Sequence, residues 1–493
     1  MHATSSRRQI LTGSVAALGL AGVTAAVTAL ADDSDATPSG EPKPQGKPRR
    51  HPNLVVIVAD DLGSGELGSY GQQLIDTPRM DELAADGLRF THAYAAAPVC
   101  APSRCSMLTG LHSGHATVRT NPFQGGQASI GDGDTTFAEV LRERGYRTAC
   151  IGKWGFGPEQ ANQPSHPNRR GFDEFYGYIG HGRAHDFYPT ALWDNGRQTV
   201  LRANMHDRRG TYAPELFRKR ALEFVSRNAA GDAPFLLYVA PNVPHAPSRR
   251  LEPAEYARRL WSKANKGHAV QVSQLDTLVG DIVDRLRAEG LEKDTVVLVT
   301  SDNGPHEEGQ VDPERFEATG ELRGFKRNLY EGGIRVPLVA WAPGRIEPGA
   351  VTDRKTPLTD LLPTLAELGG ADVPDGIDGL SVAGLMGGGR RPEAHRYLYW
   401  FRNDPHTTPR AQAADRGRGL RVCEALRQGE WKIVRFAPGR ERTVPDDRWD
   451  VELYNLRKDP GERHNVADRH PRIVSGMVAL LREAWQDPPP ARV

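Results

Sequence analysis

The chain has 493 residues, of which 38% are hydrophobic and 25% are charged, and this length leaves room for a large domain and a smaller one. Lysine plus arginine number 63 and aspartate plus glutamate number 62, so the formal net charge at pH 7 is +1. No excess of basic residues is present for a nucleic acid or an anionic membrane surface, and we expect neither as a partner.

The N-terminal 51 residues carry no pattern of a packed domain. Arg7-Arg8 precede a run of Ala, Gly, Val and Leu that ends at Ala31, which predicts a twin-arginine export signal over residues 1–31 and a periplasmic or secreted protein. The small residues at the end of the run favour cleavage over an uncleaved anchor, so we expect no membrane contact after cleavage. Residues 32–51 hold almost nothing apolar and predict a flexible linker.

Apolar runs rich in β-branched residues predict strands, and helical periodicity lies between them. Runs that are apolar at nearly every position indicate strands buried on both faces, as in parallel sheets covered by helices. We therefore predict an α/β catalytic domain over residues 52–389, with a large, mostly parallel sheet sandwiched by helices. The predicted strands are Asn53–Val58, Phe235–Val239, Thr295–Thr300 and Val336–Ala340, and the predicted helices are Thr136–Arg144, Pro214–Ser226 and Val270–Leu286.

Carboxylates and an amide follow two of these strands. Asp60-Asp61 come directly after the first strand, and Asp302-Asn303 come after the third. The carboxyl ends of parallel strands meet at one rim, where ligands bind in open α/β sheets. Adjacent carboxylates repel one another unless a cation lies between them, and four hard oxygen ligands suit a divalent cation such as calcium. A single Asp would more simply be a turn residue, but two paired sites favour a metal.

Four cysteines occur in the chain, at positions 100, 105, 150 and 423. Cys100 begins the segment Cys100–Arg104, in which Pro102 suits the first turn of a helix. On its own this thiol could be a small buried hydrophobic residue, or it could pair with Cys105 in an exported protein. So few cysteines in so long a chain do not hold the fold together.

Beyond Gly387–Gly389 the pattern changes to short strands. They are predicted at Tyr397–Trp400, Trp431–Arg435 and Leu453–Leu456, and a helix is predicted at Ile473–Trp485. We interpret residues 390–493 as a small C-terminal α+β domain.

Six short motifs follow one another along the chain: Asp60-Asp61, Cys100-Ala101-Pro102-Ser103-Arg104, Gly152-Lys153-Trp154-Gly155, Pro244-His245, Asp302-Asn303-Gly304, and Lys326 before Glu331-Gly332-Gly333-Ile334-Arg335-Val336-Pro337. Together they resemble the formylglycine-dependent sulfatases of the arylsulfatase type, in the alkaline phosphatase superfamily, from about Pro52 to the end of the chain. In that family a formylglycine-generating enzyme oxidises the cysteine to an aldehyde, so such an enzyme is an expected partner during maturation.

The resemblance implies hydrolysis of sulfate monoesters of aryl or carbohydrate compounds, with a sulfated small molecule or glycan as substrate. Hydrated formylglycine at position 100 would attack sulfur with one hydroxyl, and the other hydroxyl would let sulfate leave and restore the aldehyde. The resemblance also implies one calcium ion per chain, bound by Asp60, Asp61, Asp302, Asn303 and an oxygen of the modified Cys100.

The remaining roles also come from the resemblance. Arg104 would hold the aldehyde hydrate and balance its charge. Lys153 and Lys326 would neutralise charge on the sulfate and on the leaving oxygen. His245 would donate a proton to the leaving group.

One position departs from the family pattern. Many relatives carry histidine two residues after the strand-end lysine, where this chain has Gly155. That histidine usually contacts the formylglycine hydroxyl and helps its collapse, so another base must serve here. The sequence offers His185 as a candidate, with His306 and His112 behind it.

Two alternatives stand beside the sulfatase interpretation. The first is a phosphonate or phosphate-ester hydrolase that uses the same formylglycine. The second is a non-catalytic protein that binds sulfated glycans, motivated by Gly155. Retention of Cys100, both lysines and the four presumed metal ligands argues against the second alternative.

Overall fold

The computed structural model describes residues 51–122, 126–248, 255–388 and 391–487. All of these described residues lie in one compact unit. The predicted export signal lies outside the described residues, as does the predicted linker except for its last residue. Among the described residues, no helix combines the length and apolar character needed to cross a bilayer.

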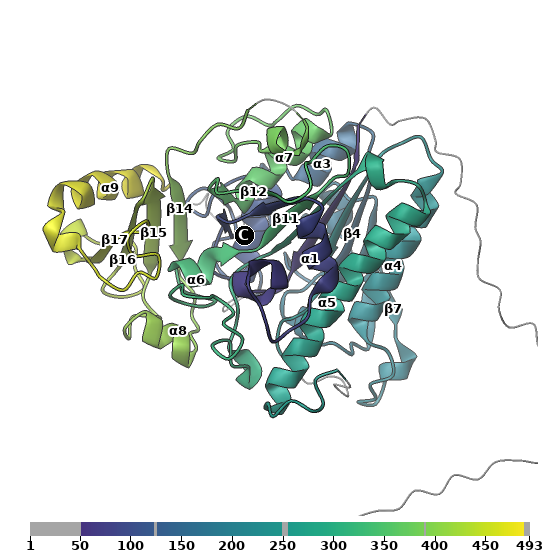
Figure 1. Cartoon of the computed structure of the whole chain (residues 1–493), viewed down its shortest axis with the longest axis horizontal. Helices are drawn as coiled ribbons and strands as arrows, with labels where there is room; N and C mark the ends of the chain where they lie inside the picture. Colours follow the sequence, from purple (N-terminus) through teal and green to yellow (C-terminus); the bar gives the residue numbers. More distant parts are fainter. Residues whose placement is uncertain (1–50, 123–125, 249–254, 389–390, 488–493) are drawn as a thin grey trace, which may run out of the picture. The chain divides into compact units, whose positions relative to one another are not determined.

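A ten-stranded mixed sheet forms the centre of the catalytic region, in the order β12-β2-β11-β9-β1-β8-β4-β5-β6-β7 (Figure 1). The five strands β9, β1, β8, β4 and β5 are parallel, and antiparallel pairs lie on both sides of them. The bounds are β1 Asn53–Ala59, β2 Leu88–Phe90, β4 Arg147–Lys153, β5 Glu174–Tyr178, β6 Ala191–Asp194, β7 Arg197–Val200, β8 Phe235–Ala240, β9 Thr295–Ser301, β11 Leu338–Trp341 and β12 Ala350–Thr352.

Helices cover both faces of this sheet, which confirms the predicted α/β class. Alternate residues of β1 point to opposite faces: Val55 and Ile57 belong to one apolar core, and Leu54 and Val56 to the other. The first core includes α1 (Pro78–Ala85), α4 (Ala213–Ala229) and α5 (Lys263–Ala288), and the second includes α2 (Cys100–Thr109), α3 (Phe137–Glu143) and α7 (Leu361–Leu368).

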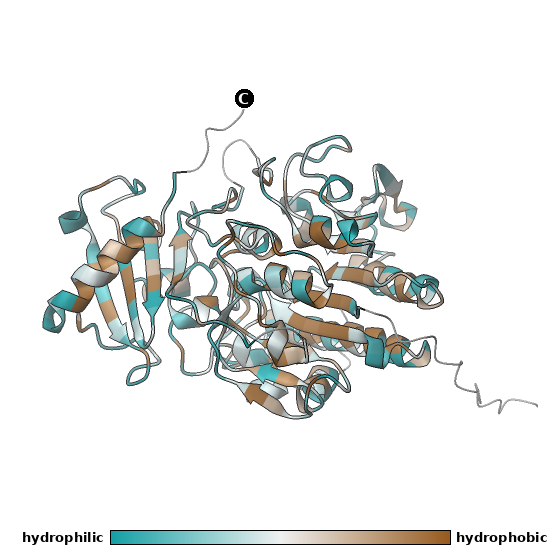
Figure 2. Ribbon diagram, turned by 90° about the horizontal axis from the view of Figure 1, so that it is seen from above, coloured by the Kyte–Doolittle hydropathy of each residue, from teal (hydrophilic) through white to brown (hydrophobic). Residues whose placement is uncertain are grey.

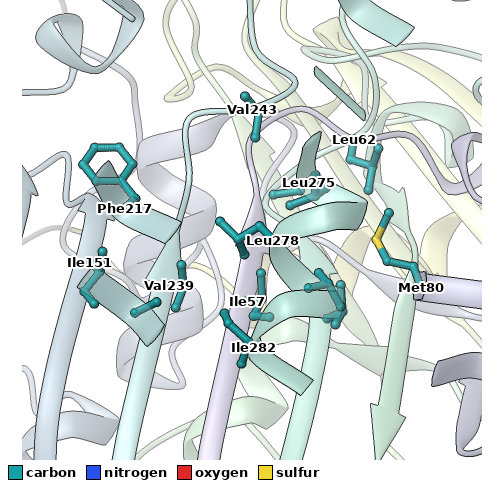
Figure 3. Close-up of a cluster of buried hydrophobic side chains, with 14 of the residues drawn as sticks. Ile57, Leu62, Met80, Ile151, Phe217, Val239, Val243, Leu275, Leu278 and Ile282 are labelled. Carbon is teal, nitrogen blue, oxygen red and sulfur yellow. The ribbon is translucent and has the colours of Figure 1, made fainter. Parts of the chain in front are cut away.

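The first core shows how strand and helix periods combine. Leu275, Leu278 and Ile282 recur at helical spacing on α5 and face the sheet residues Ile57 and Val239 (Figure 3). Each such fully buried aliphatic side chain contributes about 1.5–3 kcal/mol of transfer free energy. This packing fixes the strands whose carboxyl ends carry the candidate site.

The predicted strand Val336–Ala340 was wrong as a single element. Pro337 divides it into β10 (Arg335–Val336) and β11, which lie in different sheets. Proline has no N–H for a ladder, and here its carbonyl oxygen accepts a hydrogen bond of 2.8 Å from Thr300 Oγ1. β10 joins β3 (Ala93–Tyr94) and β13 (Thr356–Pro357) in a small three-stranded sheet.

The C-terminal region holds a four-stranded antiparallel sheet and the helix α9 (Pro471–Glu483) (Figures 1 and 2). This confirms the predicted α+β character and adds one strand, β15, that the sequence analysis did not name. The region lies in the same compact unit as the large sheet, and the domain boundary at residue 389 stays a prediction. The elements are β14 Leu398–Arg402, α8 Pro409–Ala414, β15 Cys423–Gln428, β16 Trp431–Phe436 and β17 Asp450–Asn455, preceded by the short helix α6 Glu331–Ile334.

Candidate active site

The four predicted metal ligands lie at the carboxyl ends of two neighbouring strands. β1 and β9 pair in parallel with Ala59 opposite Ser301, so the residues that follow both strands are adjacent. The backbone N–H of Asp61 donates to Asp302 Oδ1 at 3.1 Å, and Asn303 Nδ2 donates to Asp61 Oδ1 at 2.7 Å. All four side chains are 0% exposed: Asp60, Asp61, Asp302 and Asn303.

Asn303 has the clearest character of a metal ligand. Its amide nitrogen is hydrogen-bonded, whereas its Oδ1 is buried and has no hydrogen-bond partner among the described residues. Buried amide oxygens are rarely left unpartnered in native proteins. Asp60 and Asp61 lie within reach of one metal ion together with Cys100 and His245. Asp302 and Asn303 contact Asp61 directly, so their oxygens add to a set of hard donors that suits a divalent cation.

Three cations surround these carboxylates. Lys153, the last residue of β4, places Nζ 2.9 and 2.7 Å from the two carboxylate oxygens of Asp60, and Arg104 Nε lies 2.8 Å from Asp302 Oδ2. Burial alone would raise the pKa of Asp60, but Lys153 and the other nearby cations lower it well below its usual value. Burial raises the pKa of Asp302 to about 7, although Arg104 opposes this.

Cys100 is the first residue of α2 and is 0% exposed. Its Sγ lies 3.8 Å from Asp61 Oδ1. Burial raises the pKa of the thiol well above its usual value, although Lys153 and Lys326 oppose the shift. All four cysteines are free and buried, so the alternative pairing of Cys100 with Cys105 is not formed. A protonated thiol is a poor nucleophile, so the unmodified side chain is not suited to attack an ester.

His245 and Lys326 form a pair beside Asp61. His245 Nδ1 lies 2.6 Å from Ala246 O, which fixes a proton on Nδ1, and Lys326 Nζ donates to His245 Nε2 at 3.0 Å. Lys326 Nζ also lies 2.7 Å from Asp61 Oδ2. Burial, reinforced by Lys326, lowers the pKa of His245. The His245–Lys326 pair is therefore able to donate a proton to an ester oxygen.

Glu308 is a member of the site that the sequence analysis did not name. Its Oε2 lies 3.1 Å from Lys326 Nζ, and its Oε1 lies 2.7 Å from an amino group of Arg327. The lysine and the arginine lower the pKa of Glu308 well below its usual value, although burial opposes them. Glu308 and Asp61 thus hold the Lys326 ammonium group between them.

A second unnamed residue, His181, lies over Gly155. Trp154 N donates to Tyr178 O at 2.9 Å and Gly155 N donates to Ile179 O at 3.0 Å. These bonds hold the residues that follow β5 beside the residues that follow β4. A Cβ added at Gly155 would lie 3.9 Å from His181 Nδ1, an atom that is buried and has no hydrogen-bond partner among the described residues. Burial, followed by the charge of Lys153, lowers the pKa of His181 well below its usual value.

The three histidines named from the sequence lie in different surroundings. His185 stacks on His245, with ring centroids 4.2 Å apart and an interplanar angle of 9°. His306 has both ring nitrogens engaged, one with Pro244 O at 3.1 Å and one with the backbone N–H of Glu308 at 3.1 Å. His112 belongs to a separate group with His115 and Asp378.

The contacts above join all nine predicted site residues into one buried cluster. These are Cys100, Arg104, Lys153, His245 and Lys326 from the catalytic prediction and Asp60, Asp61, Asp302 and Asn303 from the metal prediction. Fold and cluster define a hydrolase of anionic esters, because carboxylates for a cation and three basic side chains meet at one buried position.

The sequence matches the Sulfatase family over residues 52–371, and a family described as N-sulphoglucosamine sulphohydrolase, C-terminal, over residues 320–485. The chain belongs to the Sulfatase family, within the alkaline phosphatase superfamily, and is a sulfuric ester hydrolase.

Its relatives share most of its length. Arylsulfatase A of Homo sapiens is 33% identical over 475 residues, which cover 87% of each chain. N-acetylgalactosamine-6-sulfatase of Canis lupus familiaris is 30% identical, with 86% of this chain and 82% of that protein covered. The crystal structure of Ps i-CgsB in complex with k-i-k-neocarrahexaose is 26% identical in sequence, with a TM-score of 0.73, and the match covers 89% of this chain and 94% of that chain. These relatives do not favour the phosphoester or non-catalytic alternatives.

Proposed function

We propose that the chain hydrolyses sulfate esters of carbohydrates or phenols by means of a formylglycine formed from Cys100 and a bound calcium ion. One observation carries the proposal: Cys100 Sγ lies 3.8 Å from Asp61 Oδ1, inside a cluster of buried carboxylates. The same cluster contains Asn303 Oδ1, which has no hydrogen-bond partner among the described residues. Formylglycine would supply a hydrated aldehyde whose hydroxyls attack sulfur and later release sulfate.

The cation would be held by Asp60, Asp61, Asp302, Asn303 and an oxygen of the modified residue 100. When bound, it polarises sulfate oxygens. Calcium is favoured over magnesium because the donors come from two strand ends and a helix start, and calcium accepts irregular oxygen coordination.

Lys153, Lys326 and Arg104 supply fixed positive charge. Burial alone would lower the pKa of both lysines, but Asp60 beside Lys153 and Asp61 beside Lys326 raise it, so both stay charged. Arg104 keeps one buried amino group, Nη1, without a hydrogen-bond partner among the described residues, and this group can donate to oxygens at position 100, whereas Nη2 lies 3.5 Å from Asp60 Oδ1. Such fixed donors stabilise charge that develops on the sulfate and the leaving oxygen.

Two proton transfers are assigned to different histidines. The His245–Lys326 pair gives a proton to the leaving oxygen, because Lys326 already donates to His245 Nε2. His181 takes a proton at Nδ1 when sulfate leaves position 100, since this atom is unpartnered and lies over Gly155. The neutral state that its lowered pKa favours is the state able to accept a proton.

The test combines peptide mass spectrometry with metal removal. We expect the purified protein to carry an aldehyde at position 100, to release sulfate from 4-nitrophenyl sulfate, and to lose this activity after chelation. Calcium is expected to restore activity better than magnesium. An intact thiol at Cys100 in fully active protein would contradict the formylglycine, and full activity after complete metal removal would contradict the cation.

Export through the twin-arginine route and oxidation by a formylglycine-generating enzyme are part of the same proposal. Their support is the Arg7-Arg8 pattern and the Cys100–Arg104 motif. Replacing both arginines with lysine should retain the protein in the cytoplasm, and expression without a formylglycine-generating enzyme should leave the thiol. Unchanged export of the lysine variant would refute the twin-arginine route. A full yield of aldehyde without the formylglycine-generating enzyme would refute the role of that enzyme.

A further inference from the structure

A pocket of about 280 Å³ opens beside His245. We call it the Arg209 pocket, and its walls come from residues 185–188, Thr190, Asn204, residues 207–209 and Pro247. This volume is near the lower end of the range for small-molecule sites, about 300 Å³. None of the assigned catalytic or metal-binding residues lines it.

The ring of His185 connects the pocket with the catalytic cluster. His185 lines the pocket and stacks on one face of His245 at 4.2 Å. His306 lies toward the other face of His245 at 5.7 Å, and Lys326 and Asp61 occupy its Nε2 edge. In the proposed function His245 serves the leaving oxygen, so the Arg209 pocket is one side chain, His185, away from the position of that oxygen.

The pocket carries charges of both signs, since Asp186 and Asp207 line it beside Arg208 and Arg209. Arg209 places its guanidinium 5.9 Å from the ring centroid of Tyr188. Its charge acts on the nearby Asp186, but the two form no ion pair among the described residues, so Arg209 is the candidate contact for an anionic group. Its neighbour Arg208 is engaged differently, because it donates to the carbonyl oxygens of Met205 at 3.1 Å and Arg202 at 3.0 Å. Arg208 therefore holds the loop, and Arg209 is left to bind a ligand.

The loop that presents Arg209 is held in a strained shape. His206 and Asp207 have φ values of +57° and +60°, a conformation that residues with a Cβ rarely adopt, and here two follow one another. Asn204 fixes the loop, because its Nδ2 donates to Pro189 O and Thr211 O, both at 2.8 Å. A loop fixed in this way loses little entropy when a ligand binds.

We propose that the Arg209 pocket binds the part of the substrate that carries the leaving oxygen, and that Arg209 pairs with a second sulfate or a carboxylate on that part. The substrate class is then a sugar sulfate with at least two anionic groups. This inference rests on the proposed function and narrows its substrate. Guanidinium is suited to this role because it forms paired hydrogen bonds with oxyanions.

Kinetics with three substrates test the proposal. We expect wild-type protein to prefer D-glucosamine-2-N,6-O-disulfate over D-glucosamine 6-sulfate and 4-nitrophenyl sulfate. Arg209→Ala should raise KM for the disulfate about 10- to 100-fold, as expected for loss of a charge-assisted contact, and leave kcat/KM for 4-nitrophenyl sulfate within about twofold. The matched control is Arg202→Ala, an exposed arginine of the same loop that does not line the pocket. Its kinetics should match wild type.

Binding measured without turnover separates this proposal from the proposed function. In a Cys100→Ala background, calorimetry should give a dissociation constant for the disulfate that Arg209→Ala raises at least about tenfold and Arg202→Ala leaves unchanged. An equal loss for all substrates, no change on loss of Arg209, or a wild-type preference for 4-nitrophenyl sulfate would overturn the Arg209 pocket as a binding site. Failure of the proposed function would appear instead as no sulfate release from any substrate, with disulfate binding intact.

Discussion

Two of the buried charge clusters among the described residues differ in what remains unpaired. In the catalytic cluster, Asn303 Oδ1 and Nη1 of Arg104 lack hydrogen-bond partners within the described part of the chain. In the second cluster, where the C-terminal sheet meets the catalytic region, Glu331 accepts from Lys432 Nζ at 3.0 Å and from Tyr94 at 2.7 Å. We call this second group the junction cluster; it also includes Arg427 and Glu462.

The comparison teaches that buried charge alone does not mark a functional site. In the junction cluster even Glu462 Oε1, which accepts no hydrogen bond among the described residues, lies 2.9 Å from Lys432 Nζ. The charges of this cluster therefore compensate one another, and removing one should cost stability. The catalytic cluster keeps donors and acceptors for groups that the chain itself does not supply. Unpartnered buried atoms therefore separate the two clusters better than the number of charges does.

The largest expected effect is the loss of activity on replacing Cys100. Cys100→Ala should lower kcat by about 10⁴-fold or more, the order seen when a nucleophile is removed. Its free energy of unfolding should change by less than about 2 kcal/mol, because only the small end group of side chain 100 is lost from the core. Steady-state assays and urea denaturation measure both quantities. Desulfation at the wild-type rate would refute the nucleophile.

Glu331→Gln in the junction cluster should show the opposite pattern. The loss of one charge leaves Lys432 and Arg427 partly uncompensated in the interior, at a cost of about 3–5 kcal/mol of unfolding free energy. Below the unfolding transition, kcat should stay within about twofold of wild type. Glu347→Gln, on an exposed side chain, is the matched control for urea denaturation. A loss of kcat without a loss of stability would remove the distinction between the clusters.

His181→Asn should affect one half of the reaction. With 4-nitrophenyl sulfate we expect a burst of about one equivalent of phenol, followed by turnover reduced about 10²-fold, as for loss of a general base. Intact-protein mass spectrometry should show the sulfate group retained on the enzyme. His206→Asn, on an exposed histidine, is the control. The same burst in His185→Asn but not in His181→Asn would reassign the base.

The smallest effect concerns acid stability. Burial lowers the pKa of His306 to about 4, and His268 and His245 reinforce this although Asp61 and Glu308 face the ring and oppose it. Between pH 6.5 and 4 the unfolded chain therefore binds a proton that the folded chain does not. The unfolding free energy falls by up to about 1.4 kcal/mol per pH unit for this one group as the pH drops.

The junction cluster should resist acid longer. Lys432 and Arg427 lower the pKa of Glu331 to about 2 although burial opposes them, so its contribution is present above pH 4.5 and is lost as the pH falls toward 2. Urea denaturation at several pH values should show that His306→Gln flattens the slope between pH 6.5 and 4, and that Glu331→Gln flattens it between pH 4.5 and 2. Equal slopes in wild type and His306→Gln would contradict this order.

The sequence predicted the parallel centre of the fold well because its strands are apolar at nearly every position. Strand β15 escaped prediction because Glu424 and Arg427 interrupt its apolar pattern. Those charges are buried by pairing, Glu424 with Arg435 at 2.7 Å, and a local pattern does not contain such a partner. The split at Pro337 was missed for a similar reason, since each half belongs to a different sheet.

The candidate site was predictable where motifs follow strand ends, as for Asp60-Asp61 and Asp302-Asn303. His181 and Glu308 carried no such signal. His181 matters only because residues 154–155 pair with residues 178–179 and Gly155 leaves space above the backbone. Glu308 matters through its contact with Lys326, which lies 18 residues further along the chain.

The complete burial of Cys100 also means that any enzymatic modification of this side chain must come before folding is complete. A thiol that is 0% exposed in the first turn of a helix cannot be reached by another protein once the core has closed around it. Any enzyme that modifies it therefore competes with collapse of the newly made polypeptide. A chain that folds too early would be locked permanently as an inert precursor, and the active fraction of a preparation would record which process was faster.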